Sequence, residues 1–147
     1  MFAFFFKVGA APFHMWLCDV YEGSLTSVTA FFATVPKIVL FSLIIQLSLF
    51  VFKGFDSFSS ILLGFCGLMS ICIASVAALY QRRLKRLLAY STISHTGFIL
   101  LGVSCGSVDS IKACAIYIIL YAFMSLSVFS VVLLSSGNII LSKYIVQ

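Results

Sequence analysis

The fold of this chain is decided by residues 25–52, whose sequence is LTSVTAFFATVPKIVLFSLIIQLSLFVF. Almost all of them are apolar or small, and a helix of this length, at about 1.5 Å per residue, crosses a bilayer of roughly 30 Å with some tilt. Pro36 and Lys37 lie near its midpoint. A lysine at that depth costs about 2.5–3.5 kcal/mol on insertion scales and needs a protein partner or water. Lys37 is therefore a candidate for ion or proton movement, and its alternative role is a structural buried ion pair.

Composition places the whole chain among membrane proteins. Of its 147 residues, 63% are hydrophobic and 9% are charged, whereas about 25% of the residues in soluble domains are charged. The net charge of +5 does not indicate nucleic-acid binding, because four of the nine Lys and Arg residues lie in the short segment 82–86. Such a segment is typical of a topology signal.

The sequence contains no pattern that indicates enzyme chemistry within this chain. Its five cysteines show no C-x-x-C spacing, and there is no Gly-rich phosphate loop. No nucleophile stands with a base where water could reach both. We therefore expect no catalytic residue, no metal site and no bound cofactor in this chain.

Hydropathy predicts an all-α, polytopic membrane helix bundle in a single domain, residues 1–147. Five crossings are expected, at 1–22, 25–52, 58–80, 87–106 and 111–135. The first is discontinuous at Pro12, because proline removes the amide that would bond the Val8 carbonyl. Water or neighbouring helices must satisfy the backbone groups that such a break frees, so breaks tend to border polar cavities. The span 58–80 predicts close packing against another helix, because it carries small residues at Gly64, Gly67, Ser70, Ala74 and Ala78.

Two titratable residues flank the predicted break. Lys7 lies a little over one turn before Pro12, and His14 lies two residues after it. We expect Lys7 to be a second buried cation, with snorkelling to the headgroups as its alternative. For His14, a proton relay and a histidine satisfied by packing are both open.

His95 falls near the middle of the span 87–106 and shares a helix face with Ser91, one turn earlier. A histidine at this depth can titrate near neutral pH and pass a proton between its two ring nitrogens, which would make His95 a proton relay. The alternative is a hydrogen bond that holds two helices together.

The basic segment 82–86 predicts the orientation of the bundle. Loops rich in Lys and Arg stay on the cytoplasmic or matrix side, and this segment contains Arg82, Arg83, Lys85 and Arg86. Counting back two crossings places residues 19–24 on the same side, and residues 53–56 and 104–110 fall on the opposite side.

Two blocks of sequence resemble the family of NADH–ubiquinone oxidoreductase chain 2, the antiporter-like membrane subunits of respiratory complex I. The first, FKVGAAPFHMWLCDVYEGSLTSVTAFFATVPKIVLF, is similar to the family pattern F-K-x-x-x-x-P-F-H-x-W-x-x-D-V-Y-x-G and its continuation. The second, QRRLKRLLAYSTISHTGFILLG, is similar to Q-x-x-[IVL]-K-R-L-L-A-Y-S-S-I-S-H-x-G-[FY]. The blocks occur in the family's order and at its spacing, and the resemblance extends from Phe2 to about Ser135.

The resemblance implies a role for five residues. Lys7 corresponds to the lysine before the break in the family's seventh helix, Pro12 to the break, and His14 to the histidine after it. Lys37 corresponds to the central lysine of the eighth helix, in the hydrated chain of charges along the membrane arm. His95 corresponds to the histidine that follows the basic loop. By this resemblance, Lys7, Lys37, His14 and His95 form a proton pathway.

The resemblance covers about helices seven to eleven of the family's fourteen. The helix whose glutamate would pair with Lys7 is absent, as is the family's second broken helix with its own lysine. We therefore expect this chain to be one piece of a split subunit that separate polypeptides complete. The expected partners are those fragments, neighbouring antiporter-like and small membrane subunits, and the lipid bilayer, with no nucleic acid. NADH, flavin, iron–sulfur clusters and quinone are expected in other subunits, and the expected location is the mitochondrial inner membrane, with segment 82–86 on the matrix side.

Three functions are open at this point. The first is a proton-translocating fragment of complex I, catalytic only as part of that NADH:ubiquinone reductase. The second is a subunit of the related multi-subunit sodium/proton antiporters, which have no redox partner. The third is a structural remnant of the same complex that no longer conducts, for which Lys37 would lie in dry surroundings.

Overall fold

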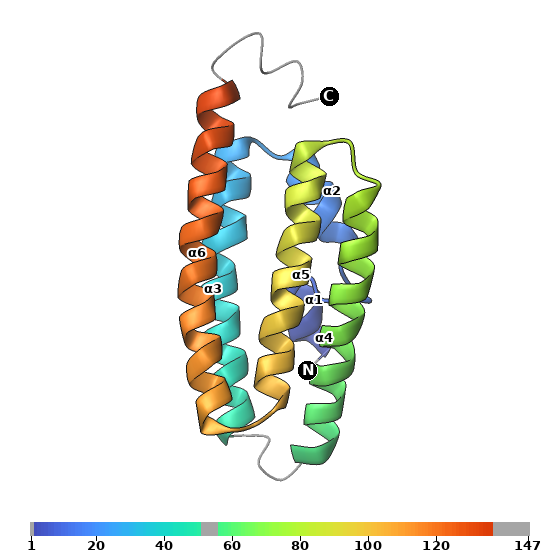
Figure 1. The fold of residues 1–147 in the computed structure, drawn as a ribbon, viewed down its shortest axis with the longest axis vertical. Coiled ribbons are helices and arrows are strands. Elements are labelled where there is room, and N and C mark those ends of the chain that lie inside the picture. Colours follow the sequence, from blue (N-terminus) through green and yellow to red (C-terminus); the bar gives the residue numbers. More distant parts are fainter. Residues whose placement is uncertain (1, 51–55, 137–147) are drawn as a thin grey trace.

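The computed structural model describes residues 2–50 and 56–136, and within them all regular structure is helical (Figure 1). The prediction of an all-α bundle is confirmed. The four longest helices stand side by side, and two short helices lie against them. The six are α1 (Phe2–Val8), α2 (Met15–Gly23), α3 (Thr26–Phe50), α4 (Asp56–Leu79), α5 (Leu84–Ser104) and α6 (Val108–Ser136).

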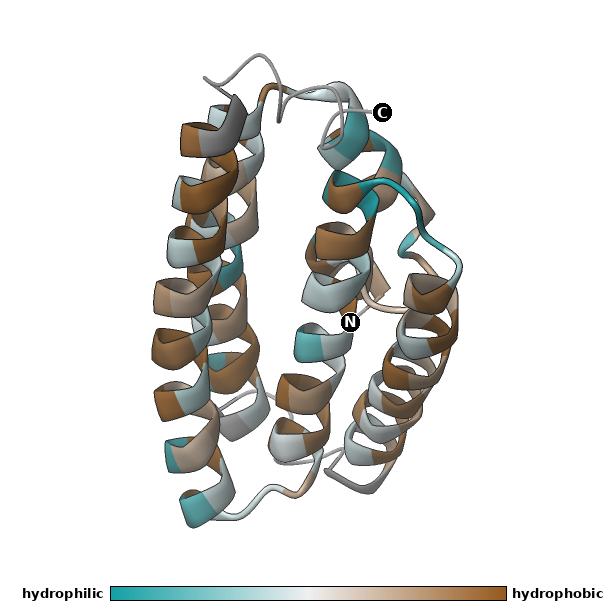
Figure 2. Cartoon of the chain, turned by 45° about the horizontal axis from the view of Figure 1, so that its top comes forward, coloured by the Kyte–Doolittle hydropathy of each residue, from teal (hydrophilic) through white to brown (hydrophobic). Residues whose placement is uncertain are grey.

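Four helices are long and apolar enough to cross a membrane, at Thr26–Ser48, Phe58–Leu79, Leu84–Ser104 and Val108–Leu134. They correspond to the last four crossings predicted. Many of their large hydrophobic side chains face outward, among them Phe31, Phe65 and Phe123. Figure 2 shows that hydrophobic residues predominate along these helices and that strongly hydrophilic residues gather at the end where α2 and the start of α5 lie. A bundle with so much exposed apolar surface is suited to lipid and not to water.

The first predicted crossing is broken, as expected. Helix α1 ends at Val8, and Gly9 has φ +78° in the left-handed region, where glycine is favoured. Pro12 lies within the non-helical connection that follows, so the break starts three residues before the proline. The halves contain 7 and 9 residues, and each is too short to cross a bilayer by itself.

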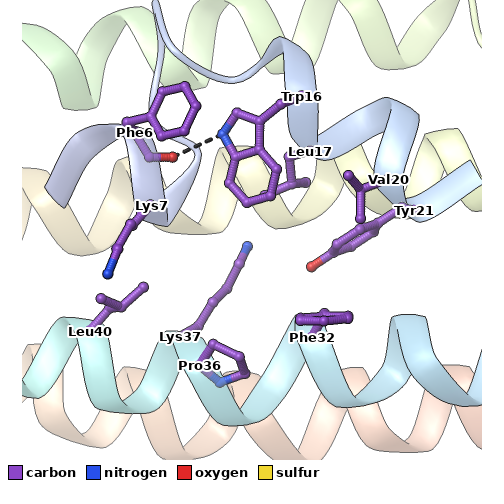
Figure 3. A pocket seen from close by; sticks show the side chains of 10 residues that line it. All are labelled: Phe6, Lys7, Trp16, Leu17, Val20, Tyr21, Phe32, Pro36, Lys37 and Leu40. Atoms are coloured by element: carbon purple, nitrogen blue, oxygen red, sulfur yellow. Dashed lines mark hydrogen bonds between the residues drawn. The ribbon is translucent and has the colours of Figure 1, made fainter. Parts of the chain in front are cut away.

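Side chains hold the two halves of the broken segment in place. The Ala11 backbone N–H donates a hydrogen bond of 2.9 Å to Ser70 Oγ on α4, which satisfies one of the groups that the break frees. The Trp16 indole N–H on α2 donates across the break to the Phe6 carbonyl on α1, at 2.9 Å (Figure 3). The break is therefore a built feature with satisfied backbone groups.

Helices α4 and α5 come into close backbone contact where two glycines face each other. A Cβ atom added to Gly97 would lie 2.8 Å from the Gly67 carbonyl oxygen, and one added to Gly67 would lie 3.0 Å from the Gly97 carbonyl oxygen. Small residues allow this backbone contact. The sequence predicted that the small residues of span 58–80 pack closely against another helix, and that helix is α5.

The basic segment meets the end of α2. Glu22 forms ion pairs with Arg83 and Arg86, and the Lys85 ammonium donates a hydrogen bond of 2.9 Å to the Ser24 carbonyl. This contact confirms that residues 19–24 and 82–86 lie at the same end of the bundle. The predicted loop is shorter than expected, because α5 begins at Leu84 and already contains Lys85 and Arg86.

Helix α6 begins at Val108, three residues before its predicted start. The Ser110 backbone N–H donates to Ser107 Oγ at 3.2 Å, and a serine in that position satisfies an otherwise free amide of the first turn. The predicted loop at 53–56 lies mostly outside the described residues, as do residues 51–52 of the predicted span.

Candidate functional site

A cavity of about 360 Å³ lies between the broken segment and α3. Lys7 on α1 and Lys37 on α3 both line it (Figure 3). Tyr21 on α2 contributes a third polar side chain, and most of the remaining lining is apolar or aromatic, including Phe6, Trp16, Leu17, Phe32 and Leu40. The structure therefore brings the two predicted lysines to one cavity beside the break.

Lys37 is almost fully buried, with 4% of its surface exposed. It lies one residue before the middle of α3, which has 25 residues, and Figure 3 shows it reaching toward Trp16 and Leu17 of α2. Within the described parts of the chain, its ammonium has no hydrogen-bond partner. The centroid of the Tyr121 ring is 5.8 Å from Nζ, within the range of a cation–π contact.

Tyr21 adds a second buried polar atom at the same cavity. Its side chain is 2% exposed, and its hydroxyl has no hydrogen-bond partner among the described residues. Buried polar groups are normally paired with protein or ordered water. Two such groups beside one hollow therefore indicate a place for water or for a polar group from another polypeptide.

Lys7 lies at the rim of this cavity. Figure 3 shows its side chain pointing from α1 into the space beside Leu40. It is exposed in this chain alone, unlike Lys37. Its burial as a second cation therefore stays a prediction.

His14 and Pro12 do not line the cavity. His14 is 8% exposed at the start of α2, and its Nδ1 has no partner among residues 2–50 and 56–136. The structure thus places His14 beside the break, as predicted, and apart from the two lysines. Its role as a relay remains a prediction.

His95 lies on α5 and does not line the lysine cavity. Its Nδ1 is 2.7 Å from the Tyr117 hydroxyl, and its ring centroid is 5.3 Å from that of Tyr121. It lines a second cavity of about 100 Å³, together with the hydroxyl-bearing residues Ser91 and Ser125. His95 and Lys37 therefore share one neighbour, Tyr121, although they lie on different helices.

The two tyrosines of α6 are functional candidates that the sequence did not identify. Tyr117 and Tyr121 are one turn apart, so they share a helix face. The sequence could have identified them, because two tyrosines on one face of an apolar helix both need hydrogen-bond partners for their hydroxyls once that face is buried. The partner of Tyr121 is the Ala33 carbonyl on α3, at 3.4 Å.

The described acidic side chains do not reach the lysine cavity. Glu22 pairs with Arg83 and Arg86, Asp19 lies 3.4 Å from Arg86, and Asp109 lies 3.3 Å from Lys112. These pairs lie near helix ends. A carboxylate partner for Lys7 or Lys37 would thus have to come from outside the described residues.

The family model described as NADH:quinone oxidoreductase/Mrp antiporter, TM, matches residues 1–147. The NADH-ubiquinone oxidoreductase chain 2 of Marchantia polymorpha is 45% identical over 135 residues, which is 92% of this chain and 27% of that protein. The NADH-quinone oxidoreductase subunit N of Ruthia magnifica is 45% identical over 129 residues, 88% of this chain and 27% of that protein. Chain 2 of Arabidopsis thaliana is 42% identical over 130 residues, 88% of this chain and 26% of that protein.

This chain spans about a quarter of the length of these curated relatives. The similarity covers α1 to α6 and both lysines of the cavity.

Proposed function

The chain belongs to the NADH:quinone oxidoreductase/Mrp antiporter transmembrane family, and on that basis we propose that it is a proton-translocating part of the membrane arm of respiratory complex I. One observation carries the proposal. Lys37 is buried near the middle of a helix long and apolar enough to cross a membrane, beside a cavity, with no hydrogen-bond partner for its ammonium among the described residues.

The free-energy cost of placing Lys37 at this depth in a membrane supports a functional role for it. A charged amine at this depth is unfavourable by about 2.5–3.5 kcal/mol on insertion scales, and the contact with Tyr121 offsets only part of that, since a desolvated cation–π contact contributes about 2 kcal/mol. Intramembrane lysines with this placement mark ion and proton pathways.

The proposed cycle uses Lys37 as a site that holds and releases one proton. Its Nζ takes a proton from water in the cavity, and Lys7 at the rim exchanges protons with the same water. A carboxylate that approaches within about 4–6 Å favours the ammonium, and its withdrawal favours the neutral amine. Such a carboxylate would come from another polypeptide. A movement that changes this separation would therefore load and unload the lysine.

In this proposal, the chain performs no redox chemistry. NADH, flavin, iron–sulfur clusters and quinone would be bound by other subunits of the NADH:quinone reductase. Its partners would be the polypeptides that complete the subunit and its membrane neighbours. The location would be the mitochondrial inner membrane, with the basic segment 82–86 on the matrix side.

The relatives favour complex I over the sodium/proton antiporter alternative, since those at 42–45% identity are named as oxidoreductase subunits. An experiment distinguishes the proton-translocating fragment from a structural remnant that no longer conducts. If the chain were such a remnant, Lys37 would be dispensable for proton movement.

The test is Lys37→Met in the assembled complex, with protons moved per electron and the NADH:quinone rate as readouts. We expect a lower ratio or stalled turnover, because Met fills the site and holds no proton. Lys112→Met is the matched control, since Lys112 is exposed and pairs with Asp109 at a helix end. Unchanged pumping by the Lys37 variant would refute the proposal.

A further inference from the structure

The Tyr121 ring lies beside two titratable side chains, Lys37 and His95. It lies 5.8 Å from the Lys37 ammonium and 5.3 Å, centroid to centroid, from the His95 ring. Tyr121 is itself buried, with 7% of its surface exposed. Three helices therefore meet at this side chain, because Lys37 is on α3, His95 on α5 and Tyr121 on α6.

The Tyr121 ring is also fixed to the helix that carries the lysine. Its hydroxyl donates to the Ala33 carbonyl, at 3.4 Å. Ala33 lies four residues before Lys37, which is one helical turn, so the two lie on the same side of α3. The ring is thereby held where it faces the lysine.

We propose that Tyr121 is a positioning residue, whose ring holds the Lys37 ammonium and the His95 imidazole near each other so that a proton passes between them. This inference rests on the proposed function. The ring attracts the charged ammonium and has no comparable attraction for a neutral amine. The ring has no exchangeable proton on its face, so the proton itself would travel through water, from the cavity that Lys37 lines to the one that His95 and Tyr121 line.

In this transfer, one proton moves from Lys37 through water to His95. Lys37 Nζ gives its proton to water and becomes a neutral amine, and water gives a proton to His95 Nε2, which makes the imidazolium. For Nε2 to accept, Nδ1 must carry the hydrogen, and in that tautomer the Tyr117 hydroxyl, 2.7 Å from Nδ1, can accept it. The contact with Tyr117 is thus compatible with the tautomer that the transfer needs, and Tyr121 sets the position of the His95 ring.

The experiment compares Tyr121→Leu, which removes the ring, with Tyr121→Phe, which keeps it and removes the hydroxyl. Protons moved per electron are measured in the assembled complex, normalised to the amount of complex. We expect a loss for Tyr121→Leu and a smaller loss for Tyr121→Phe, because Phe keeps the ring beside Lys37 and lacks only the hydroxyl contact with the Ala33 carbonyl. Phe123→Leu is the matched control, because Phe123 is an aromatic residue of the same helix with 69% of its surface exposed. Tyr121→Met, also without a ring, is used if the Leu variant does not assemble.

A double variant separates positioning from general destabilisation. If Tyr121 acts through Lys37, Tyr121→Leu combined with Lys37→Met lowers the ratio no further than Lys37→Met alone, because coupled residues are not additive. A wild-type ratio in the ring-less variants would overturn the inference, as would an equal loss in Tyr121→Phe. If Lys37→Met lowers the ratio while Tyr121→Leu does not, only the positioning role falls, and the proposed function stands.

Discussion

Replacing Lys37 by Met should make α3 insert more readily into a bilayer, even though it removes the proposed proton site. Lys37 lies one residue before the middle of the 25 residues of α3, where a lysine costs about 2.5–3.5 kcal/mol on insertion scales. Met is close to neutral there, so the apparent insertion free energy should improve by about 2.5–3.5 kcal/mol. At about 1.4 kcal/mol per factor of ten, insertion should be favoured by roughly 60- to 300-fold.

The assay places α3 as a test segment between two glycosylation acceptor sites in microsomes, where the glycosylation pattern reports insertion. The segment is first shortened from its ends until about half of the parent inserts, so that a change in either direction can be measured. Gln46→Met is the control, because Gln46 is uncharged and nearer the end of the helix. If Lys37→Met improves insertion no more than Gln46→Met, the ammonium does not lie at bilayer depth and the reasoning fails.

Two further predictions concern contacts that hold the site in place. Gly97→Ala should cost about 1–3 kcal/mol in the stability of the assembled complex, because the new Cβ would lie 2.8 Å from the Gly67 carbonyl oxygen. In thermal inactivation, Gly64→Ala should be tolerated, since its Cβ would lie 3.6 Å from its nearest neighbour; equal losses in both variants would contradict this packing. Glu22→Gln removes the carboxylate that pairs with Arg83 and Arg86, and should cost about 1 kcal/mol or less for each exposed pair. That loss should shrink at high salt, and a salt-independent loss would show that charge is not its cause.

Local sequence was sufficient to predict the helices and the break. Long apolar runs identify membrane helices because backbone groups in lipid must bond within the segment. Pro12 predicted the broken segment. The start of the break at Gly9 was also predictable, because Gly9 adopts a left-handed backbone conformation that favours glycine. The depth of Lys37 also followed from its place near the middle of a span.

The surroundings of Lys37 could not be predicted in the same way. The Tyr121 hydroxyl bonds the Ala33 carbonyl, 88 residues away in sequence, and nothing in either segment specifies that contact. The cavity depends on how α1 and α2 pack on α3, which is a property of three helices together. For the same reason, the sequence did not reveal that His14 lies apart from the lysines, although all three were identified as candidates.

The fixed geometry around the break suggests how the site keeps its shape. Ser70 and Trp16 satisfy backbone groups on either side of the break, and the arginines of the basic segment hold the end of α2. The cavity walls are thus anchored on α4 and α5. Movement of the proposed carboxylate can then change the proton affinity of Lys37 without loss of the cavity.

The central claim is that Lys37 is tolerated in the membrane because protons reach it. The most direct measurement is an experimental density map of the assembled complex around the Lys37 ammonium. We predict ordered water in the cavity beside it and a carboxylate of another polypeptide within about 6 Å, the range over which an opposite charge changes proton affinity. Density showing that lipid tails or apolar side chains fill the cavity, with no water or carboxylate near Nζ, would contradict the claim.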